Sequence, residues 1–452
     1  MKTYAIVLAA GKGTRMKSEL PKVMHRLCGI PMIEHLTYKL KQVNVDEIYV
    51  VVGHGKEVVM NHFKEDESIT FIEQKEQLGT GHAVMQVAPY LAGKEGKTLI
   101  LTGDTPLLSE ATLKQLIIAD HTWDSKATVL VTEQENPTGY GRIVRNEKGN
   151  VQRIVEEKDA TIEEKQLKEV NTGIFCFDNV PLFSHITQLK TENVQQEYYL
   201  TDMVEVLHEE GIHTRVAKTD SANEVMGIND RLQLAKAEQF LRQQINDYHL
   251  LNGVTLQDPT NTYIDLFVEI ESDTYIEANV KLTGTTKIGK KCRITNGSHV
   301  HNSVIGNETI VTQSIVLDST IGEKGQIGPF AHIRPETEIK NHVRIGNFVE
   351  VKKSTIGTGS KVSHLSYIGD AEIGEHVNVG CGAITVNYDG EKKHKTVVED
   401  HAFIGCNANL IAPVTVSKHA LIAAGSTITK NVPEGALAIA RQHQLTKENY
   451  KK

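Results

Sequence analysis

The second half of the chain repeats itself every six residues, and this period restricts the possible fold more than any other feature. Aliphatic residues recur in register at Ile264, Ile270, Ile276, Leu282, Ile288, Ile294 and Val300, then at Ile315, Ile321, Ile327, Ile333, Ile339, Ile345 and Val351. With shifts of one residue, the register continues as far as Ile428. An α-helix repeats every 3.6 residues and a plain strand every two, so neither explains the spacing. A six-residue period predicts a solenoid in which each hexad supplies a short strand and a turn, with the aliphatic side chain facing the core.

Glycine often follows the aliphatic residue, as in Ile288-Gly289 and Ile321-Gly322, and we expect it to relax the corners of the coil. With three hexads to a coil, the repeat predicts roughly eight to ten coils stacked ~4.8 Å apart. The repetition does not determine the hand of the coil. The hexads stop around Cys381–Phe403, where a polar, turn-rich insert runs from Asn387 to His394. Loops extruded from rigid scaffolds commonly carry function.

The first half alternates between strand-like and helical patterns. Apolar runs typical of strands occupy Tyr4–Ala9, Ile48–Val52, Ile69–Ile72, Thr98–Leu101, Ala127–Val131 and Gly173–Phe177. Helical patterns such as Pro31–Gln42 and Glu110–Ala119 separate several of them. This alternation predicts an α/β, Rossmann-like domain with a mainly parallel sheet and ligands beyond the carboxyl ends of its strands. Between Asp230 and Leu251, apolar residues three and four apart predict one long linker helix.

Composition excludes several classes of protein. A length of 452 residues predicts two or three domains. Lys and Arg number 49 against 57 Asp and Glu, so the net charge of −8 argues against a nucleic-acid partner. No apolar run approaches the roughly 20 residues that span a bilayer, so we expect no integral membrane association. Five widely spaced cysteines without a C-x-x-C pair indicate a reducing, cytoplasmic location.

The loop after the first strand is a candidate phosphate-binding element. It reads L-A-A-G-K-G-T-R-M over residues 8–16 and matches neither a Walker A loop nor a complete G-x-G-x-x-G pattern. Its small residues still allow backbone N–H groups to approach a phosphate or a base. Lys12, Arg15 and Lys22 supply cations for a polyphosphate. The alternative is an ordinary turn between a strand and a helix.

Two further strands end in residues suited to ligand binding. Asp104 follows the strand that ends in Thr102-Gly103, where a carboxylate can hold Mg²⁺ or can simply cap the next helix. Gln74 and the G-T-G-H stretch at 79–82 follow another strand. Their amide and backbone groups suit the edge of a pyrimidine base.

The first half, residues 1 to about 229, resembles sugar-phosphate nucleotidyltransferases. An ordered set of motifs carries the likeness: residues 8–16 with Pro21-Lys22, G-T-G-H-A at 79–83, T-G-D at 102–104, G-Y-G-R-I at 139–143, Glu156, and N-T-G-I at 171–174. The solenoid, V-K-K at 351–353, H-L-S-Y-I-G-D at 364–370, N-Y-D-G at 387–390 and Arg441 extend the likeness to nearly the whole chain. Over that length the chain resembles the bacterial bifunctional N-acetylglucosamine-1-phosphate uridylyltransferase/glucosamine-1-phosphate N-acetyltransferase family.

This resemblance implies a fold and a domain plan. It implies an α/β nucleotidyltransferase domain and a left-handed parallel β-helix of hexapeptide repeats. The uridylyltransferase domain would span residues 1–229, the linker helix 230–250, and the N-acetyltransferase domain with a C-terminal tail 251–452. The chain would acetylate glucosamine 1-phosphate from acetyl-CoA and then transfer uridylyl from UTP, for peptidoglycan and other cell-envelope precursors. The family also implies a homotrimer, in which the polar insert would reach a neighbouring chain.

The resemblance implies one set of residues for the uridylyl site. Binding of UTP and UDP-N-acetylglucosamine would fall to Leu8, Ala9, Ala10, Gly11, Arg15, Lys22, Gln74, Gly79, Thr80, Gly141, Glu156, Asn171 and Asn229. Mg²⁺ would be held by Asp104 and Asn229, while Arg15 and Lys22 would neutralise the triphosphate. Because phosphoryl transfer depends mostly on positioning and charge, no protein nucleophile is required.

A second set follows for the acetyl site. His364 would be the general base, since imidazole titrates near neutral pH, and Glu350 would orient it. The sugar phosphate would be bound by Arg334, Lys352, Tyr367 and Asn378. Acetyl-CoA would be bound by Cys381, Asn387, Tyr388, Cys406, Ala424 and Arg441. Relatives often carry Ala and Ser at the two cysteine positions, so these thiols would add thiol sensitivity.

Three other readings stay open at this point. A single-activity sugar-phosphate nucleotidyltransferase with a regulatory solenoid predicts no acetyl-CoA turnover. A zinc enzyme of the γ-carbonic anhydrase kind would use His299 and His301 with His332 or His342. A non-enzymatic scaffold built from the same two folds would not need Lys22 or Asp104.

Overall fold

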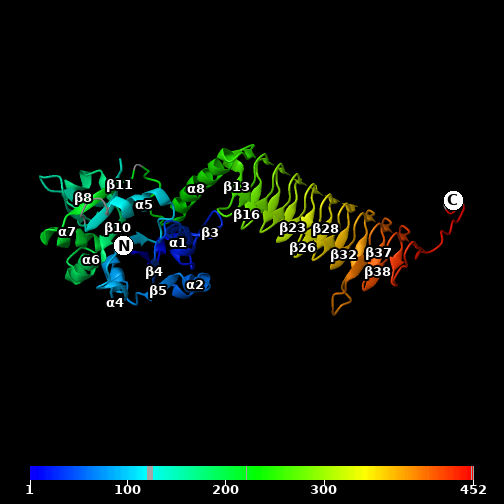
Figure 1. Cartoon of the computed structure of the whole chain (residues 1–452), viewed down its shortest axis with the longest axis horizontal. Coiled ribbons are helices and arrows are strands. Elements are labelled where there is room, and N and C mark those ends of the chain that lie inside the picture. The colour runs from blue at the N-terminus through cyan, green and yellow to red at the C-terminus, as the bar shows by residue number, and fades with distance from the viewer. Residues whose placement is uncertain (120–125, 220, 449, 451–452) are drawn as a thin grey trace. The chain divides into compact units, whose positions relative to one another are not determined.

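The computed structural model describes residues 1–119, 126–219, 221–448 and 450 (Figure 1). The chain divides into two compact units, Met1–Leu241 and Arg242–Lys452. The division falls inside helix α8, Arg231–Leu251, which is the long helix predicted from the sequence. No helix in the described part of the chain is long and apolar enough to cross a membrane.

The first unit is built on a nine-stranded sheet with the central order β11-β7-β10-β6-β1-β4-β5. Its strands are β1 Thr3–Ala9, β4 Glu47–Val52, β5 Ile69–Glu73, β6 Lys97–Thr102, β7 Ala127–Glu133, β8 Gly141–Arg145, β9 Val151–Val155, β10 Glu169–Asp178 and β11 Thr214–Lys218. A separate hairpin joins β2 Arg26–Leu27 to β3 Ile30–Pro31. Strands β6, β1, β4 and β5 run parallel, as predicted.

Strand β10 departs from the predicted parallel order, because it runs antiparallel to both β6 and β7. It follows the antiparallel β8–β9 pair through a link that contains only the short 3-10 turn Glu164–Gln166. Between β7 and β10 the chain forms the β8–β9 hairpin and this 3-10 turn rather than a crossover helix, so it returns antiparallel beside β7 and the sheet is mixed.

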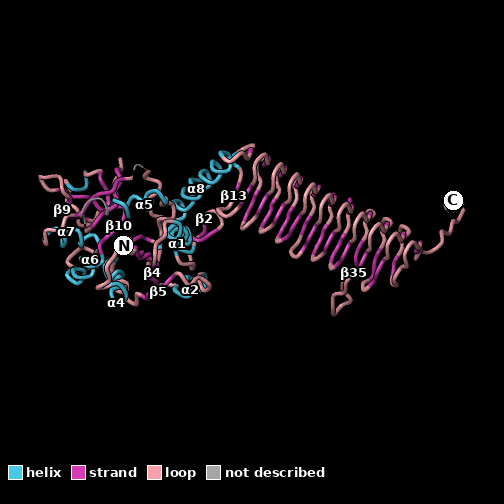
Figure 2. Tube along the Cα trace, in the orientation of Figure 1, coloured by secondary structure: helices cyan, strands magenta, loops and turns pink. Residues whose placement is uncertain are grey.

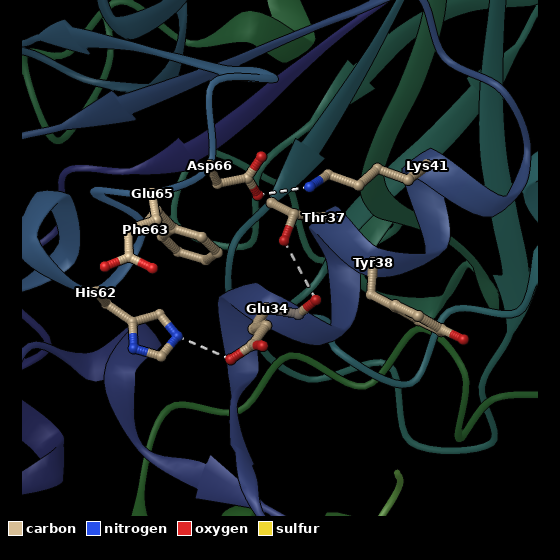
Figure 3. A pocket seen from close by; sticks show the side chains of 8 residues that line it. All are labelled: Glu34, Thr37, Tyr38, Lys41, His62, Phe63, Glu65 and Asp66. Atoms are coloured by element: carbon tan, nitrogen blue, oxygen red, sulfur yellow. Dashed lines mark hydrogen bonds and ion pairs between the residues drawn. The ribbon is translucent and has the colours of Figure 1, made fainter. Parts of the chain in front are cut away.

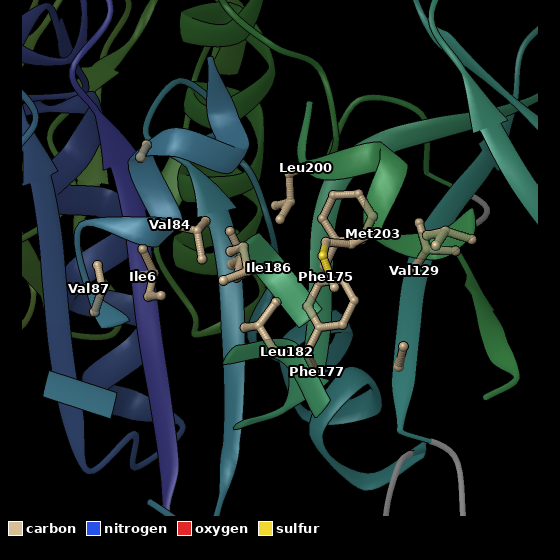
Figure 4. Close-up of a cluster of buried hydrophobic side chains, with 14 of the residues drawn as sticks. Ile6, Val84, Val87, Val129, Phe175, Phe177, Leu182, Ile186, Leu200 and Met203 are labelled. Atoms are coloured by element: carbon tan, nitrogen blue, oxygen red, sulfur yellow. The ribbon is translucent and has the colours of Figure 1, made fainter. Parts of the chain in front are cut away.

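Helices cover the two faces of this sheet. They are α1 Met32–Gln42, α2 Lys56–His62, α3 Thr80–Met85, α4 Ala88–Leu91, α5 Glu110–Ala119, α6 Asn179–His185 and α7 Met203–Glu209. The side chains of β1 alternate between two buried clusters, with Ile6 in one and Ala5 and Val7 in the other. Figure 4 shows the first cluster, in which Leu182 of α6 and Met203 of α7 are packed with residues of the strands. The core thus holds the strands rigidly and leaves their carboxyl ends for ligands.

The second unit consists of three parallel sheets of very short strands (Figure 2). The first solenoid sheet contains β12 Thr255–Leu256, β15 Tyr275–Ile276, β18 Arg293–Ile294, β21 Ile310–Val311, β24 Gln326–Ile327, β27 Arg344–Asn347, β30 Lys361–His364, β33 Asn378–Val379, β36 Phe403–Ile404, β39 Leu421–Ile422 and β41 Leu437–Ala438. The second contains β13 Tyr263–Ile264, β16 Lys281–Thr283, β19 His299–His301, β22 Ile315–Leu317, β25 His332–Ile333, β28 Glu350–Lys352, β31 Tyr367–Gly369, β34 Ile384–Val386, β37 Asn409–Ile411 and β40 Thr427–Ile428. The third contains β14 Glu269–Ile270, β17 Lys287–Ile288, β20 Val304–Ile305, β23 Ser319–Ile321, β26 Thr337–Ile339, β29 Thr355–Ile356, β32 Ala371–Ile373, β35 Thr396–Val398 and β38 Val414–Val416.

From β12 to β40 every third strand joins the same sheet, so the predicted parallel β-helix with three strands to a coil is confirmed. The repeating aliphatic residues point inward, and Ile276, Val300 and Ile345 are fully buried. The left-handed coil that the resemblance implies stays a prediction. In Figure 2 the polar insert stands out from the stack of coils just before β35.

The corners of the coil differ from the expectation. Many left-handed corner residues are not glycine, for example His342, Phe348 and Leu365. The glycine after the aliphatic residue serves close packing between coils instead. At Gly306 a Cβ atom would lie 2.6 Å from the Gly322 carbonyl carbon of the next coil, which leaves no room for a side chain.

The first half of α8 is part of the first unit. Glu238 Oε2 accepts a hydrogen bond from the Cys28 N–H at 2.9 Å, and Ala237 and Leu241 are buried. We therefore expect a 1–241 fragment to be more stable than a 1–231 fragment by about 2 kcal/mol or more, or about 4–8 °C in Tm. Thermal unfolding of the two fragments would check this, and equal Tm values would contradict it.

Candidate functional site

A pocket of about 320 Å³ opens at the carboxyl ends of the central strands of the first unit. Its lining is Leu8, Ala9, Ala10, Gly11, Lys22, Val23, Gln74, Gln77, Gly79, Thr80, Ala83, Thr102, Asp104 and Glu197. The loop after β1, the loop after β5 and the end of β6 therefore meet at one site, as the parallel topology predicts. Most of the residues assigned to the nucleotide lie in this wall.

Lys22 contacts both candidate metal ligands; Lys22 and Asp104 line the pocket, and Asn229 does not. The Lys22 Nζ atom lies 2.5 Å from Asp104 Oδ2 and 3.0 Å from Asn229 Oδ1. The Ile228 N–H donates to the Asp104 carbonyl, which holds Asn229 beside the end of β6. Two oxygens that share one ammonium group can also share a metal ion. One carboxylate with substrate phosphates is a usual environment for Mg²⁺, so these residues fit that ion.

Gln74 is fixed beside the G-T-G-H stretch. It is only 3% exposed, and its Nε2 donates to the Gly79 carbonyl at 3.1 Å. Gly79 has φ +108°, and a Cβ there would lie 2.6 Å from the Tyr198 carbonyl oxygen, so only glycine fits. Thr80 Oγ1 accepts from the Leu200 N–H at 3.0 Å, which connects this wall to the segment at 200–201.

Gly141, Glu156 and Asn171 form a second group, which does not line the pocket. A Cβ on Gly141 would lie 3.5 Å from Glu156 Oε1 and 3.6 Å from the Asn171 Cβ. Thr201 Oγ1 donates to Glu156 Oε1 at 3.2 Å. Burial raises the pKa of Glu156, against the opposing hydrogen bond from Thr201. Burial and the nearby Glu205 and Glu156 carboxylates raise the pKa of Asp202 to about 6. Such a cluster is rich in acceptors for sugar hydroxyl groups.

Some expectations for the first unit change in the structure. Arg15 is exposed in the 3-10 turn Thr14–Met16 and does not line the pocket. Gln77 and Glu197 line it, although the sequence did not point to them. Gln77 lies three residues after Gln74 in the same loop, and this closeness in sequence could have identified it as a candidate pocket residue. Glu197 reaches the wall only because its segment packs against Gly79.

In the second unit, His364 ends β30 and faces Asn347 of β27. The His364 Nδ1 atom lies 2.7 Å from Asn347 Oδ1, and the two residues are direct partners in the parallel ladder. Because the amide oxygen only accepts, Nδ1 carries the proton and Nε2 carries the lone pair. The expectation that Glu350 orients His364 is wrong, because Glu350 Oε1 pairs with Arg334 Nη1 at 2.7 Å.

Three cations gather on the second solenoid sheet. Arg334 and Lys352 are accompanied by Lys393 of the insert, whose pKa is lowered chiefly by the adjacent Lys352 amine. Lys352 Nζ has one acid partner, Asp370, at 3.7 Å. Two lysines in contact repel each other, so an anion between them would be favourable. The sequence did not single out Lys393, because nothing local shows that the insert folds back onto Lys352.

Asn387 joins this cluster from the start of the insert. Its Nδ2 donates to Asp370 Oδ2 at 2.5 Å and lies 3.4 Å from Tyr367 Oη. Tyr388 is exposed, and its hydroxyl donates to the Gly390 carbonyl within the insert. Arg334, Lys352 and Tyr367 are thus brought together, with Asn387 rather than with Asn378.

The remaining residues assigned to the acetyl site lie elsewhere on the coil. Asn378 belongs to β33 of the first solenoid sheet, away from the sheet that carries Lys352. Cys381, Cys406 and Ala424 follow the first-sheet strands on successive coils. Arg441 approaches the same edge, since a Cβ on Gly425 would lie 3.9 Å from its Cδ.

The zinc alternative finds no support. His299 Nε2 and His301 Nδ1 both contact Thr283 Oγ1, at 3.0 and 2.9 Å. Within residues 1–119, 126–219, 221–448 and 450, no three His, Cys, Asp or Glu side chains are grouped to hold a metal.

A second pocket, of about 380 Å³, lies between α1 and α2 (Figure 3). The side chains that line it are Glu34, Thr37, Tyr38, Lys41, His62, Phe63, Glu65 and Asp66. Lys41 pairs with Asp66 at 2.5 Å and His62 with Glu34 at 2.7 Å, so both basic groups already have acid partners. None of the residues predicted for either site lies in this pocket.

Comparison with known proteins agrees with this arrangement. The family model described as "MobA-like NTP transferase domain" matches residues 5–190. The fold and the pocket thus define a nucleotidyltransferase-type domain that is followed by a parallel β-helix.

Curated relatives match the whole chain. A bifunctional protein GlmU from Listeria welshimeri is 51% identical over 451 residues, covering 100% of this chain and 98% of the relative. GlmU proteins from a Geobacillus species and from Halalkalibacterium halodurans are 53% and 52% identical, over 450 and 447 residues, and cover 100% and 99% of this chain and 98% of each relative. The chain belongs to the family of bifunctional GlmU enzymes.

Proposed function

We propose that this chain makes UDP-N-acetylglucosamine in two steps. The second unit transfers the acetyl group of acetyl-CoA to the amine of glucosamine 1-phosphate. The first unit then joins the product to the uridylyl group of UTP and releases pyrophosphate. We also propose the functional boundaries 1–229, 230–250 and 251–452, and a cytoplasmic location. Membership of the GlmU family supports both activities.

The contact of Lys22 with both Asp104 and Asn229 carries the proposal for uridylyl transfer. A phosphate oxygen of the sugar phosphate attacks the α-phosphorus of UTP, and pyrophosphate leaves. Mg²⁺ held by Asp104 and Asn229 would supply positive charge at the reacting phosphate. Lys22 brings a fixed positive charge to the same place, while Gln74 and Gly79 hold the base. Glu156 and Asn171 bind the sugar hydroxyl groups.

Acetyl transfer rests on His364 and the three-cation cluster. Arg334, Lys352 and Lys393 bind the phosphate of the amino sugar. The Nε2 of His364 removes a proton from the amine as nitrogen attacks the thioester carbonyl, and the carbon–sulfur bond breaks to release coenzyme A. Asn347 keeps the proton on Nδ1, so that Nε2 is free to act.

Assays of the purified chain for each half-reaction test the proposal. Pyrophosphate release must require UTP, Mg²⁺ and N-acetylglucosamine 1-phosphate. Release of the coenzyme A thiol must require acetyl-CoA and glucosamine 1-phosphate. Pyrophosphate release without any coenzyme A release would favour the single-activity nucleotidyltransferase with a regulatory solenoid.

Lys393→Ala is expected to raise the KM for glucosamine 1-phosphate and to lower kcat/KM for acetyl transfer by roughly tenfold or more, because one phosphate contact is lost. Steady-state kinetics with varied sugar phosphate would measure this. Lys395→Ala is the matched control, since Lys395 directly follows the insert but pairs with Glu372. Equal effects of the two substitutions would count against a phosphate role for Lys393.

We propose further that the acetyl site is completed in a homotrimer. Asn378 and Lys352 lie on different sheets of one chain, and we infer that a pocket that contains both draws on two copies. Lys352→Ala and Asn378→Ala chains that are unfolded and refolded together should then regain activity. Random mixing about a threefold axis leaves about a quarter of the sites intact. Each variant refolded alone is the control, and no recovery in mixed trimers proven by sedimentation would confine the site to one chain.

A further inference from the structure

Two thiols occupy equivalent positions on adjacent coils of the solenoid. Strands β33 and β36 pair in parallel, with Asn378 opposite Phe403 and Val379 opposite Ile404. The same offset continues past the strands, because the Asn407 N–H donates to the Cys381 carbonyl at 2.7 Å. Cys381 therefore stacks on Cys406. The coil spacing of ~4.8 Å lies within the Cα–Cα range of about 4.4–6.8 Å that a disulfide spans.

These two thiols can be reached from solvent, unlike the other three cysteines. Cys406 is exposed and Cys381 is half-buried, whereas Cys28, Cys176 and Cys292 are buried. Burial raises the pKa of the Cys176 thiol to about 12 and also raises that of Cys292. Because only a thiolate attacks a disulfide, Cys176 and Cys292 are poor reactants and serve as internal controls.

The stacked pair continues a column that includes His364. The Gly382 N–H donates to the His364 carbonyl, as Asn407 does to Cys381 and as Gly425 does to Cys406. The order along the column is thus His364, Cys381, Cys406 and Ala424. The thiols begin one coil from the proposed base and end one coil before Ala424, along the proposed acetyl-CoA side of the site.

We propose that Cys381 and Cys406 form an oxidisable dithiol that accepts a low-molecular-weight disulfide and closes into a Cys381–Cys406 disulfide. One thiolate attacks the external disulfide, forms a mixed disulfide and releases one small thiol. The second cysteine, as a thiolate, attacks the protein sulfur of that mixed disulfide and releases the second small thiol. The protein loses two electrons and two protons, and the external disulfide is reduced to two thiols.

Closure of this disulfide blocks acetyl transfer, and this part of the inference rests on the proposed function. The link draws together two side chains in the wall that would contact acetyl-CoA. Uridylyl transfer is unaffected, since its proposed residues belong to the other unit. Either cysteine alone would form only a mixed disulfide with the small thiol. The pair on adjacent coils can form an intramolecular disulfide, which inhibits acetyl transfer reversibly.

The test uses the full-length chain and oxidised glutathione. After reaction, alkylation and peptide mapping should show the loss of two alkylatable thiols and a linked Cys381–Cys406 peptide, with Cys176 and Cys292 unlinked. Acetyl transfer should fall in proportion to the linked fraction and return with dithiothreitol, while uridylyl transfer stays constant. The Cys406→Ser variant lacks the second thiol, so its reaction with oxidised glutathione should stop at a glutathione adduct on Cys381. The acetyl transfer of the treated variant is compared with that of its own reduced sample.

Each other outcome overturns part of the proposal. Separate glutathione adducts on both cysteines, or two unreacted thiols, would overturn the pairing. A fully linked protein with full acetyl transfer would overturn the block. A reduced protein without acetyl transfer would instead refute the proposed function, while the peptide map would still decide whether the pair forms.

Discussion

Asp104→Ala is expected to lower uridylyl transfer by roughly 10³-fold or more and to leave acetyl transfer near its normal rate. Asp104 offers the carboxylate among the oxygens that surround Lys22 Nζ, and its loss removes the strongest ligand for Mg²⁺. Acylation of an amine by a thioester needs no metal, so the second activity measures the amount of intact second unit in the preparation, and thermal unfolding of the variant measures the folding of the first unit. Pyrophosphate release and coenzyme A release, assayed in the same preparation, would measure both effects.

Asp66→Ala is the matched control for Asp104→Ala. Asp66 is also paired with a lysine at 2.5 Å in the first unit, but it lies in the second pocket. We expect the control to retain both activities. A folded Asp104→Ala protein that lost both activities equally, or that kept full uridylyl transfer at low Mg²⁺, would remove Asp104 from the proposed metal site.

His364→Ala is expected to lower acetyl transfer by roughly 10²–10⁴-fold, the usual contribution of a general base. Uridylyl transfer should not change. In the unaltered protein, acetyl transfer should fall as the pH becomes acidic, because a protonated imidazole cannot accept the amine proton. The residual activity of His364→Ala should lack this decline. Rates measured from acidic to neutral pH would check both statements.

His419→Ala controls for the loss of any exposed histidine from the solenoid. His419 is exposed on a corner and stacks on His401, with ring centroids 5.0 Å apart. We expect nearly normal acetyl transfer from this variant. Near-normal acetyl transfer by His364→Ala at neutral pH would exclude His364 as the base.

Local sequence patterns predicted much of the fold. The hexad period was sufficient for a three-sided parallel β-helix, because each aliphatic residue has to be buried at the same place in each coil. Alternating strands and helices likewise predicted the parallel centre of the first sheet. The antiparallel strand β10 was missed, since the direction of a strand depends on the length and path of its connection rather than on its own residues.

The site was predictable to a different degree in each unit. The loop after β1 and Asp104 could be assigned from the rule that ligands bind at the carboxyl ends of parallel strands. Asn229 could be assigned to the site only from the family resemblance. It lies 207 residues from Lys22 in the sequence, and the two side chains come into contact only when the chain folds. Residues of the β-helix surface carry little local signal, since outward positions accept most side chains.

The amino-acid order alone therefore established two halves, their periods, the buried aliphatic column and the strand ends where ligands bind. These features follow from local geometry, in which a period or a turn is set by neighbours in the chain. The fold was required to show Asn347 rather than Glu350 beside His364, Lys393 beside Lys352, and the stacking of Cys381 on Cys406. Those relations depend on coil registers and on the path of an insert, and distances between residues far apart in sequence exist only once the chain has packed.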